Sequence, residues 1–263
     1  MARVILILIL VFTFYRFLEC SDKPKIYKNM HIKNLKYLDF DYFIKKFGDY
    51  RVLIEKFKCK FEIATIKDYC QNILQCDQGG YLKSEDEYDL LKTLGIKEQI
   101  LKEFNTFFDK NVKNIIHRDL GFFMGGKGTV TNWHTDIEDL NYLYVVKGKK
   151  RIMLSSPIYN DCMYEENHYS GGARWSNINF KNVDYDKYPK YKNAVIHTYT
   201  LNEGDCIYVP KNWWHCVENL EDSIGIVYKI FTINYIYTCF MENIRMIYNV
   251  YILGNRRRDI TII

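Results

Sequence analysis

From about Leu120 onward the sequence is a succession of short apolar segments separated by Gly, Asn, Asp and Pro. Each segment has the length of a β-strand, and residues that favour turns fall between successive segments. The clearest segments occupy residues 143–146, 151–154, 194–199, 206–209 and 223–231. Many short strands joined by turns are typical of a sandwich or a jelly-roll barrel, and not of a parallel sheet with crossover helices. The sequence therefore predicts a mainly β fold in this part of the chain.

The residues before this region mix extended and helical patterns. Residues 51–54 and 61–66 have the pattern of strands, whereas residues 84–107 carry apolar side chains at helical spacing, with a break expected at Gly95. The 263 residues, 48% of them hydrophobic, contain no Gly/Ser/Pro-rich linker, which predicts one catalytic-sized domain. Within it we expect an N-terminal α/β flank over residues 21–115 and a β-barrel core over residues 116–235.

The first twenty residues have the pattern of a targeting segment. Arg3 precedes an unbroken apolar run over residues 4–12, which is long enough for the core of a signal peptide and too short to span a bilayer comfortably. We therefore expect residues 1–20 to be a signal peptide or an anchor. That expectation places the protein in the secretory pathway or the endoplasmic reticulum lumen.

The last segment, residues 236–263, is predicted to be an amphipathic and basic extension. Apolar residues such as Phe240 and Ile244 lie among polar ones, and Glu242 interrupts any run that could span a membrane. Three consecutive arginines follow at positions 256–258. Such a segment is expected either to cover the barrel or to pair two chains as a homodimer.

Charge and cysteine content argue against three further classes of protein. The formal net charge of +5 is mild and the lysines are spread along the whole chain, so there is no strong signal for nucleic-acid binding. The eight cysteines form no Cys-x-x-Cys pair. A structural zinc site or a thioredoxin-like redox motif is therefore not expected.

Two histidines and one aspartate stand out as candidate metal ligands. His134 and Asp136 are two positions apart, and residues i and i+2 of a strand point to the same face. About eighty residues later, His215 ends the pattern Gly-Asp-x-x-x-x-Pro-x-x-Trp-Trp-His over residues 204–215. A His-x-Asp alone is a weak signal. Two histidines and one carboxylate on one face of an octahedral metal, however, leave three positions open, which is the arrangement of non-haem Fe(II) oxygenases.

Taken together, these motifs resemble the JmjC family, in particular the small hydroxylase branch that includes the asparaginyl hydroxylase of hypoxia-inducible factor. Gly128-Thr129 precedes the first motif, and Gly148-Lys149-Lys150-Arg151 lies between the two. The resemblance covers most of residues 34–231. It implies a double-stranded β-helix, that is, a jelly-roll or cupin barrel with flanking helices, in which residues 116–235 are the JmjC core.

The resemblance also implies a set of site residues. The implied Fe(II) ligands are His134, Asp136 and His215. The implied partners of the far carboxylate of the cosubstrate 2-oxoglutarate are Thr131 and Lys150, with Lys149 as the alternative cation and Asn141 as a weaker candidate for the same pocket. The lysine has an independent physical reason, because a buried carboxylate without a partner is costly and the closed end of the barrel should supply a cation and a hydroxyl.

By this resemblance, the expected activity is that of a 2-oxoglutarate-dependent dioxygenase that hydroxylates a protein side chain in an extended peptide. A lysyl demethylase and a hydroxylase of a modified tRNA base, with RNA as the partner, are alternatives with the same chemistry. A non-catalytic JmjC-fold binding protein is an alternative of another class, which the sequence Val227-Tyr228-Lys229 favours because relatives often carry Asn near that point. The resemblance also makes the cytoplasm or nucleus the alternative location.

Several other residues imitate functional motifs. His117-Arg118-Asp119 resembles the catalytic loop of protein kinases, but no Gly-rich loop precedes it and no Asp-Phe-Gly follows. We expect it to lie at a turn before a barrel strand. His168 and His197 are expected to be loop or packing residues, and Trp213 and Trp214 to form the wall of the barrel mouth.

Overall fold

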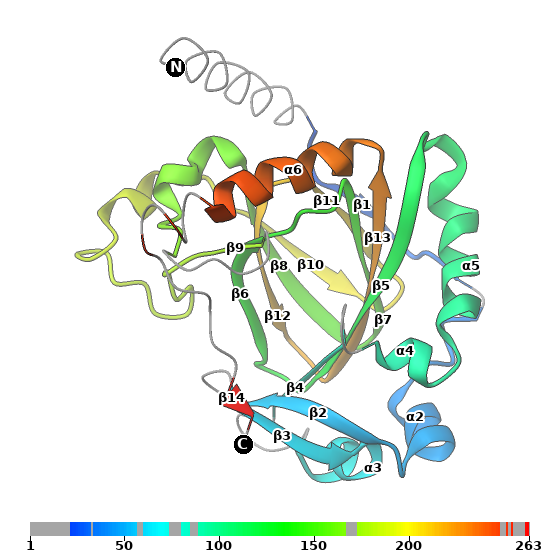
Figure 1. The fold of residues 1–263 in the computed structure, drawn as a ribbon. Coiled ribbons are helices and arrows are strands. Elements are labelled where there is room, and N and C mark those ends of the chain that lie inside the picture. Colours follow the sequence, from blue (N-terminus) through cyan, green and yellow to red (C-terminus); the bar gives the residue numbers. More distant parts are fainter. Residues whose placement is uncertain are drawn as a thin grey trace.

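Two β-sheets face each other and form a barrel, with helices packed on the outside (Figure 1). This computed structural model describes residues 22–32, 34–56, 60–73, 80–84, 89–166, 173–247, 251, 254 and 261–262. The expected targeting segment (1–20), His168 and the arginines at 256–258 therefore lie outside the described residues. The mainly β fold predicted from the sequence, with the two-sheet barrel and flanking helices that the resemblance implies, is confirmed.

Among the described residues, the larger sheet runs in the order β1-β11-β7-β13-β5-β4-β2-β3-β14 and the smaller in the order β10-β8-β12-β6-β9. All pairings are antiparallel except that of β14 with β3. The strands of the larger sheet are β1 (Lys25–Tyr27), β11 (Cys206–Pro210), β7 (Leu140–Lys147), β13 (Ser223–Thr232), β5 (Ile115–Gly125), β4 (Tyr81–Ser84), β2 (Arg51–Lys56), β3 (Lys60–Thr65) and β14 (Thr261–Ile262). The strands of the smaller sheet are β10 (His197–Asn202), β8 (Lys149–Ser155), β12 (Trp214–Asn219), β6 (Val130–Thr135) and β9 (Arg174–Trp175).

Helices cover the outer face of the larger sheet (Figure 1). The helical elements are α2 (Phe40–Phe47), α3 (Ile66–Asp68), η2 (Tyr69–Ile73), α4 (Leu90–Thr93), α5 (Lys97–Phe108), η3 (Asp109–Asn111), η4 (Pro157–Cys162), η5 (Pro189–Asn193) and α6 (Asn234–Ile247). Gly95 has φ of +71° and separates α4 from α5, which confirms the predicted break. The expected flank and the barrel core share one sheet, because β4 pairs with β5.

Strand alternation sorts the apolar side chains into three clusters. In β13, Ile226 and Tyr228 point outward to the helices and join the largest cluster, whose aromatic centre is Phe104 of α5. A second cluster fills the barrel with side chains such as Leu154 of β8. A third cluster, which includes Trp214, lies on the outer face of the smaller sheet. The barrel interior therefore holds both packed apolar side chains and the cavity described below, which Leu143, Ile152 and Val209 of the second cluster help to line.

Three expectations about local structure were wrong. His117 does not lie at a turn but inside β5, where it pairs with Phe231 of β13. The pairing of these two strands extends beyond His117 as far as Ile115. Of residues 194–199, only those from His197 onward are strand, because η5 ends at Asn193 and residues 194–196 form an irregular connection to β10. Residue 84 belongs to β4 and not to the helical region.

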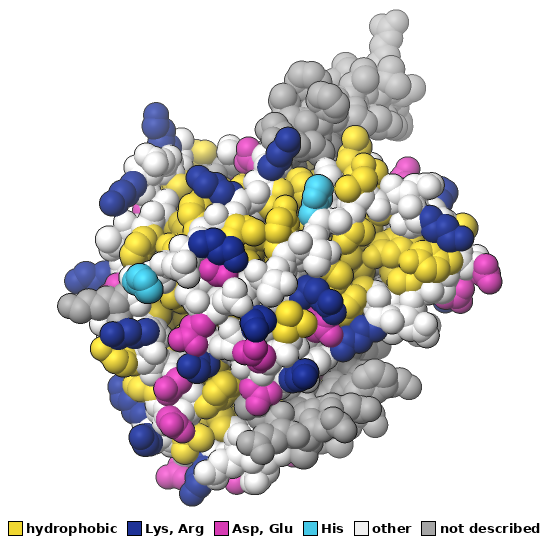
Figure 2. Space-filling view, turned by 180° about the vertical axis from the view of Figure 1, so that it is seen from behind, with side chains coloured by type: hydrophobic (Ala, Val, Ile, Leu, Met, Phe, Trp, Pro, Cys, Tyr) yellow, Lys and Arg dark blue, Asp and Glu magenta, His cyan; other side chains and the backbone are white. Residues whose placement is uncertain are grey.

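The C-terminal helix α6 carries exposed apolar side chains, including Ile236, Phe240 and Ile244. It is amphipathic, as the sequence predicts. Pairing of two chains through this segment stays a prediction. No helix among the described residues is long and apolar enough to cross a membrane. Positive and negative side chains are interspersed over the face seen in Figure 2, in keeping with the mild net charge.

Candidate metal centre

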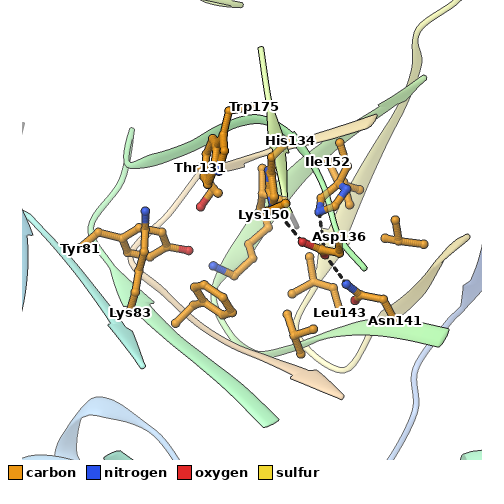
Figure 3. A pocket seen from close by; sticks show the side chains of 16 residues that line it. Tyr81, Lys83, Thr131, His134, Asp136, Asn141, Leu143, Lys150, Ile152 and Trp175 are labelled. Atoms are coloured by element: carbon orange, nitrogen blue, oxygen red, sulfur yellow. Dashed lines mark hydrogen bonds and ion pairs between the residues drawn. The ribbon is translucent and has the colours of Figure 1, made fainter. Parts of the chain in front are cut away.

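His134 and His215 lie opposite each other on neighbouring strands of the smaller sheet. They are direct partners in the register of β6 and β12, and their ring centroids are 4.0 Å apart. Asp136 follows the end of β6 and turns its carboxylate toward His134 (Figure 3) and toward His215. Its oxygens lie 3.7 Å from Nε2 of His134 and 3.3 Å from Nε2 of His215. One ligand atom from each of the three residues lies within 4.8 Å of the others, so the structure brings the three predicted ligands together.

The other nitrogen of each imidazole is held by the backbone. Nδ1 of His134 lies 2.7 Å from the carbonyl oxygen of Asn132, and Nδ1 of His215 lies 3.1 Å from that of Trp213. A carbonyl oxygen only accepts hydrogen bonds, so each Nδ1 carries a proton and donates it. This leaves the Nε2 atoms to face Asp136 as metal ligands, the orientation that such outer contacts fix in metalloproteins.

The charges of the three side chains suit a divalent cation. Burial, and after it the neighbouring His215, lower the pKa of His134 to about 3, so this ring is neutral. Burial raises the pKa of Asp136, but the charge of His215 and the hydrogen bond from it outweigh burial and hold that pKa below its usual range. Burial lowers the pKa of His215, but Asp136 outweighs it and raises that pKa. A carboxylate between two imidazoles is an anionic site that a cation can occupy in place of a proton.

Two residues that are not themselves candidate metal ligands hold Asp136 and His134 in position. The side-chain amide of Asn141, on β7, donates a hydrogen bond to Oδ2 of Asp136. The indole of Trp175, on β9, stacks on the ring of His134 with centroids 4.8 Å apart and an interplanar angle of 16°. The sequence predicted Asn141 as a pocket residue but gave no sign of Trp175. Nothing local marks that tryptophan, because it reaches the site only through the pairing of β9 with β6.

A cavity of about 170 Å³ adjoins these residues inside the barrel, and its walls include Thr131, Asn141 and Lys150 (Figure 3). In a regular strand Thr131 and His134, three positions apart, would point to opposite faces. The register of β6 against β12 shifts by one residue between the pairs His134–His215 and Thr131–Val217. This β-bulge turns Thr131 to the same face as His134 and so into the cavity.

Lys150 lies at the closed end of the cavity and is fully buried. Gly148, at φ +74°, forms the tight turn before β8, where a Cβ would lie 2.1 Å from the carbonyl oxygen of Asp222. Alternation along β8 then points Lys150 inward and Lys149 outward, where Lys149 pairs with Glu221 at 2.8 Å. Of the two lysines left open by the sequence, Lys150 is therefore the one in the cavity.

The surroundings of Lys150 fit a ligand that carries a carboxylate. Its Nζ lies 2.7 Å from Oδ1 of Asn219, and burial lowers its pKa to about 7. Within the part of the chain that the structure describes, Lys150 has no carboxylate partner. The phenol of Tyr81, on β4, also points into this end of the cavity beside Lys150 (Figure 3). A cation, a hydroxyl and a phenol at the closed end match the demands of a dicarboxylate whose other end reaches the metal ligands.

Other residues singled out in the sequence lie away from the cavity. Trp214 is buried on the outer face of the smaller sheet, where its Nε1 donates to Oδ1 of Asn160 at 2.8 Å. Trp213 packs in the barrel cluster. The expectation that Trp214 forms the wall of the barrel mouth was therefore wrong, and for Trp213 it stays a prediction. Trp175 lies in the wall of the cavity. His197 is an exposed strand residue whose ring lies 6.1 Å from that of Trp213.

Comparison with known proteins identifies the family. A model described as a cupin-like domain matches residues 28–241, which is most of the chain. The fold described above, a barrel of two facing antiparallel sheets with flanking helices, agrees with that match. The chain therefore belongs to the JmjC-like cupin family.

Individual relatives match over different lengths. HSPB1-associated protein 1 of Rattus norvegicus is 28% identical over 178 residues, which cover 62% of this chain and 36% of the rat protein. JmjC domain-containing protein D of Dictyostelium discoideum is 32% identical over 108 residues, 41% of this chain and 24% of that protein. JmjC domain-containing protein A of the same organism is 25% identical over 235 residues, 81% of this chain and 89% of that protein. The chain thus spans about a third of the length of the HSPB1-associated protein.

Proposed function

We propose that this chain is an Fe(II)- and 2-oxoglutarate-dependent oxygenase that hydroxylates a side chain of a protein substrate. The observation that carries the proposal is the convergence of two Nε2 atoms and one carboxylate beside a cavity that ends in a buried lysine. The ligand set matches the two-histidine, one-carboxylate triad, and membership of the JmjC-like cupin family supports this class of chemistry.

Fe(II) would be held by His134, Asp136 and His215, which leave half of an octahedral coordination sphere open. When bound there with 2-oxoglutarate, the iron supplies the oxidising chemistry, in which O₂ converts the cosubstrate to succinate and CO₂ and one oxygen atom enters a substrate C–H bond. The backbone carbonyls at Nδ1 fix the tautomer of both histidines. The protein thereby presents two lone pairs and one negative charge without rearrangement of the site.

The remaining residues of the cavity would orient the cosubstrate and exclude water. Lys150 and Thr131 would bind the far carboxylate of 2-oxoglutarate, because an ammonium and a hydroxyl at the closed end offset the cost of its burial. Asn141 would keep the carboxylate of Asp136 in position through the hydrogen bond to Oδ2. Trp175 would cover one face of His134 and keep bulk water from that side.

A protein is the substrate class that the comparisons favour. The name of HSPB1-associated protein 1 records association with another protein, and that relative matches 62% of this chain. The mild net charge and the interspersed charged side chains of Figure 2 do not mark a surface for nucleic acid. A lysyl demethylase and a tRNA-base hydroxylase would use the same site residues, and assays with candidate peptides and RNAs distinguish them by succinate release.

An anaerobic titration with Fe(II) and 2-oxoglutarate tests the chemistry. A visible charge-transfer band is expected in the unaltered protein, because the keto acid would bind the metal directly. His134→Ala is expected to abolish the band by removing one of three protein ligands. His117→Ala is the matched control, since His117 also stands in a His-x-Asp sequence but lies on β5 against Phe231, outside the cavity. The control is expected to keep the band.

Two outcomes would contradict the proposal. A correctly folded, unaltered protein without any band would favour a non-catalytic JmjC-fold binding protein. Equal bands in His134→Ala and in the parent would place the iron elsewhere.

A further inference from the structure

Asn219, at the end of β12, contacts the ammonium of Lys150 and is itself firmly held. Its Oδ1 accepts the hydrogen bond from Nζ at 2.7 Å, and its side chain is buried. Its backbone N–H donates to the carbonyl of Thr129 at 2.9 Å, and its own carbonyl accepts from the N–H of Gly128 at 2.7 Å. The side-chain amide nitrogen lies 3.4 Å from the carbonyl oxygen of Gly126, which directs Oδ1 toward the lysine.

Gly225, on β13, provides the space through which the side chain of Lys150 runs. A Cβ at this position would lie 2.7 Å from Cε of Lys150 and 3.5 Å from its Nζ. Contacts shorter than 3.0 Å are not found for real Cβ atoms, so the lysine would have to move. The position of the ammonium in the cavity therefore depends on the absence of a side chain at residue 225.

The chemical nature of the Asn219 contact matters more than its length. An ammonium has three donors, and the amide oxygen of Asn219 uses one of them without cancelling the charge. A carboxylate at the same place would form an ion pair and leave little unbalanced charge for a ligand. An amide keeps the lysine oriented and leaves its charge available for a carboxylate that enters the cavity.

We propose that Asn219 and Gly225 are positioning residues that direct Lys150, without a protein carboxylate to neutralise it, toward the far carboxylate of 2-oxoglutarate. The proposal rests on the function proposed above and deepens it. Asn219 sets the direction and charge state of the contact, and Gly225 sets the path of the side chain. Selectivity for a dicarboxylate thus depends on two residues that need not touch the ligand.

Asn219→Asp is the sharpest test, because it keeps the shape of the side chain and changes only its charge. Calorimetry on the Mn(II)-loaded protein would compare 2-oxoglutarate with 2-oxopentanoate, which has the same chain but lacks the far carboxylate. The unaltered protein is expected to prefer 2-oxoglutarate. The variant is expected to bind it about tenfold to a hundredfold more weakly, the worth of a charge-assisted hydrogen bond, and to bind 2-oxopentanoate with little change.

Gly225→Ala tests the second residue independently. It is expected to lower the preference for 2-oxoglutarate over 2-oxopentanoate in the same direction, because the added methyl group displaces the ammonium. Ile226→Val is the matched control, since Ile226 is the next residue of β13 but packs on the outer face of the sheet. The control is expected to keep the preference, and all three variants are expected to keep the affinity for Mn(II).

The outcomes separate this inference from the proposed function. Folded Asn219→Asp and Gly225→Ala variants with the parent's preference between the two ligands would overturn the inference alone. If Asn219→Asp does not fold, the Gly225→Ala result decides. Failure of the unaltered, Mn(II)-loaded protein to bind 2-oxoglutarate would overturn the proposed function, and the roles of Asn219 and Gly225 with it.

Discussion

His134 and His215 are direct register partners on β6 and β12, although about eighty residues separate them in the sequence. This single pairing brings the two imidazoles to a centroid distance of 4.0 Å. The β-bulge next to it rotates Thr131 onto the same face. The pairing of two strands therefore assembles two candidate metal ligands and one candidate contact of the cosubstrate at once.

Removal of the amide of Asn141 should weaken metal binding. Asn141→Ala deletes the hydrogen bond to Oδ2 of Asp136, and outer contacts of this kind are worth about tenfold to a hundredfold in metal affinity. Calorimetric titration with Mn(II) measures the loss. Asn177→Ala is a control, because the amide of Asn177 contacts only the backbone of Tyr164 and Glu165. Equal affinities in the two variants would contradict the role of Asn141.

The affinity for 2-oxoglutarate should depend on pH through Lys150. Burial lowers the pKa of this group to about 7, whereas a bound carboxylate favours its charged form. Above pH 7 the free lysine is neutral and must take up a proton on binding, so affinity should fall by up to about tenfold per pH unit. Below pH 7 this group should have no effect. Calorimetry of the Mn(II)-loaded protein from about pH 6 to 9 measures the dependence.

Lys150→Met is the control for this pH dependence. The other titratable side chains that line the cavity are Tyr81, Lys83, His134, Asp136 and His215. All of them remain in the variant. If the affinity of the variant falls less steeply above pH 7 than that of the parent, the difference is due to Lys150. An unchanged slope would contradict the assignment. Without ligand, the parent should gain stability relative to the variant as the pH rises from about 7 toward about 10.4, because the unfolded chain then holds a proton that the folded chain has lost.

Loss of the indole of Trp175 should have a smaller effect on the metal. Stacking on His134 is worth about 0.5–1.5 kcal/mol, so Trp175→Ala should weaken Mn(II) binding by about twofold to tenfold. Trp175→Phe should restore most of the affinity, because a ring remains against the imidazole. A loss in Trp175→Ala as large as that of His134→Ala would contradict a stacking role, and so would no loss at all.

The aromatic cluster outside the barrel should dominate the stability of the fold. Phe104 is fully buried, stacks on Tyr228 at a centroid distance of 5.2 Å and meets Tyr144 edge-on at 5.9 Å. Phe104→Ala should lower the free energy of unfolding by about 3–5 kcal/mol in a denaturant titration. Phe107, on the same helix, is 45% exposed, and Phe107→Ala should change stability by about 0.5 kcal/mol or less. Similar losses in both variants would contradict this account.

The parts of the site that follow strand periodicity could be predicted from the sequence. His134 and Asp136 can be recognised because an imidazole and a carboxylate lie two positions apart in a strand pattern. His215 can be recognised because it ends the longer motif over residues 204–215. The strand segments 143–146, 151–154, 206–209 and 223–231 all lie inside strands of the structure. Local pattern suffices here, since each of these features is encoded within a dozen residues.

The features that depend on pairing between distant strands could not be predicted. Trp175, Asn219 and Gly225 reach the site only through the ladders of β9 with β6, β12 with β8, and β13 with β7. To choose between Lys149 and Lys150, one must know which residues of β8 point into the barrel. The sequence does not show this for the first residues of the strand. Trp214 was misplaced for the same reason, because its neighbour His215 takes the inward face and alternation turns the indole outward.

The central claim is that His134, Asp136 and His215 bind one ferrous ion, and anomalous diffraction tests it most directly. Crystals grown anaerobically with Fe(II) and 2-oxoglutarate would be measured on both sides of the iron absorption edge. We expect one strong anomalous peak within bonding distance of both Nε2 atoms and the Asp136 carboxylate, with the cosubstrate extending toward Lys150. Iron bound at another place, or a peak that leaves any of the three side chains unbonded, would contradict the claim.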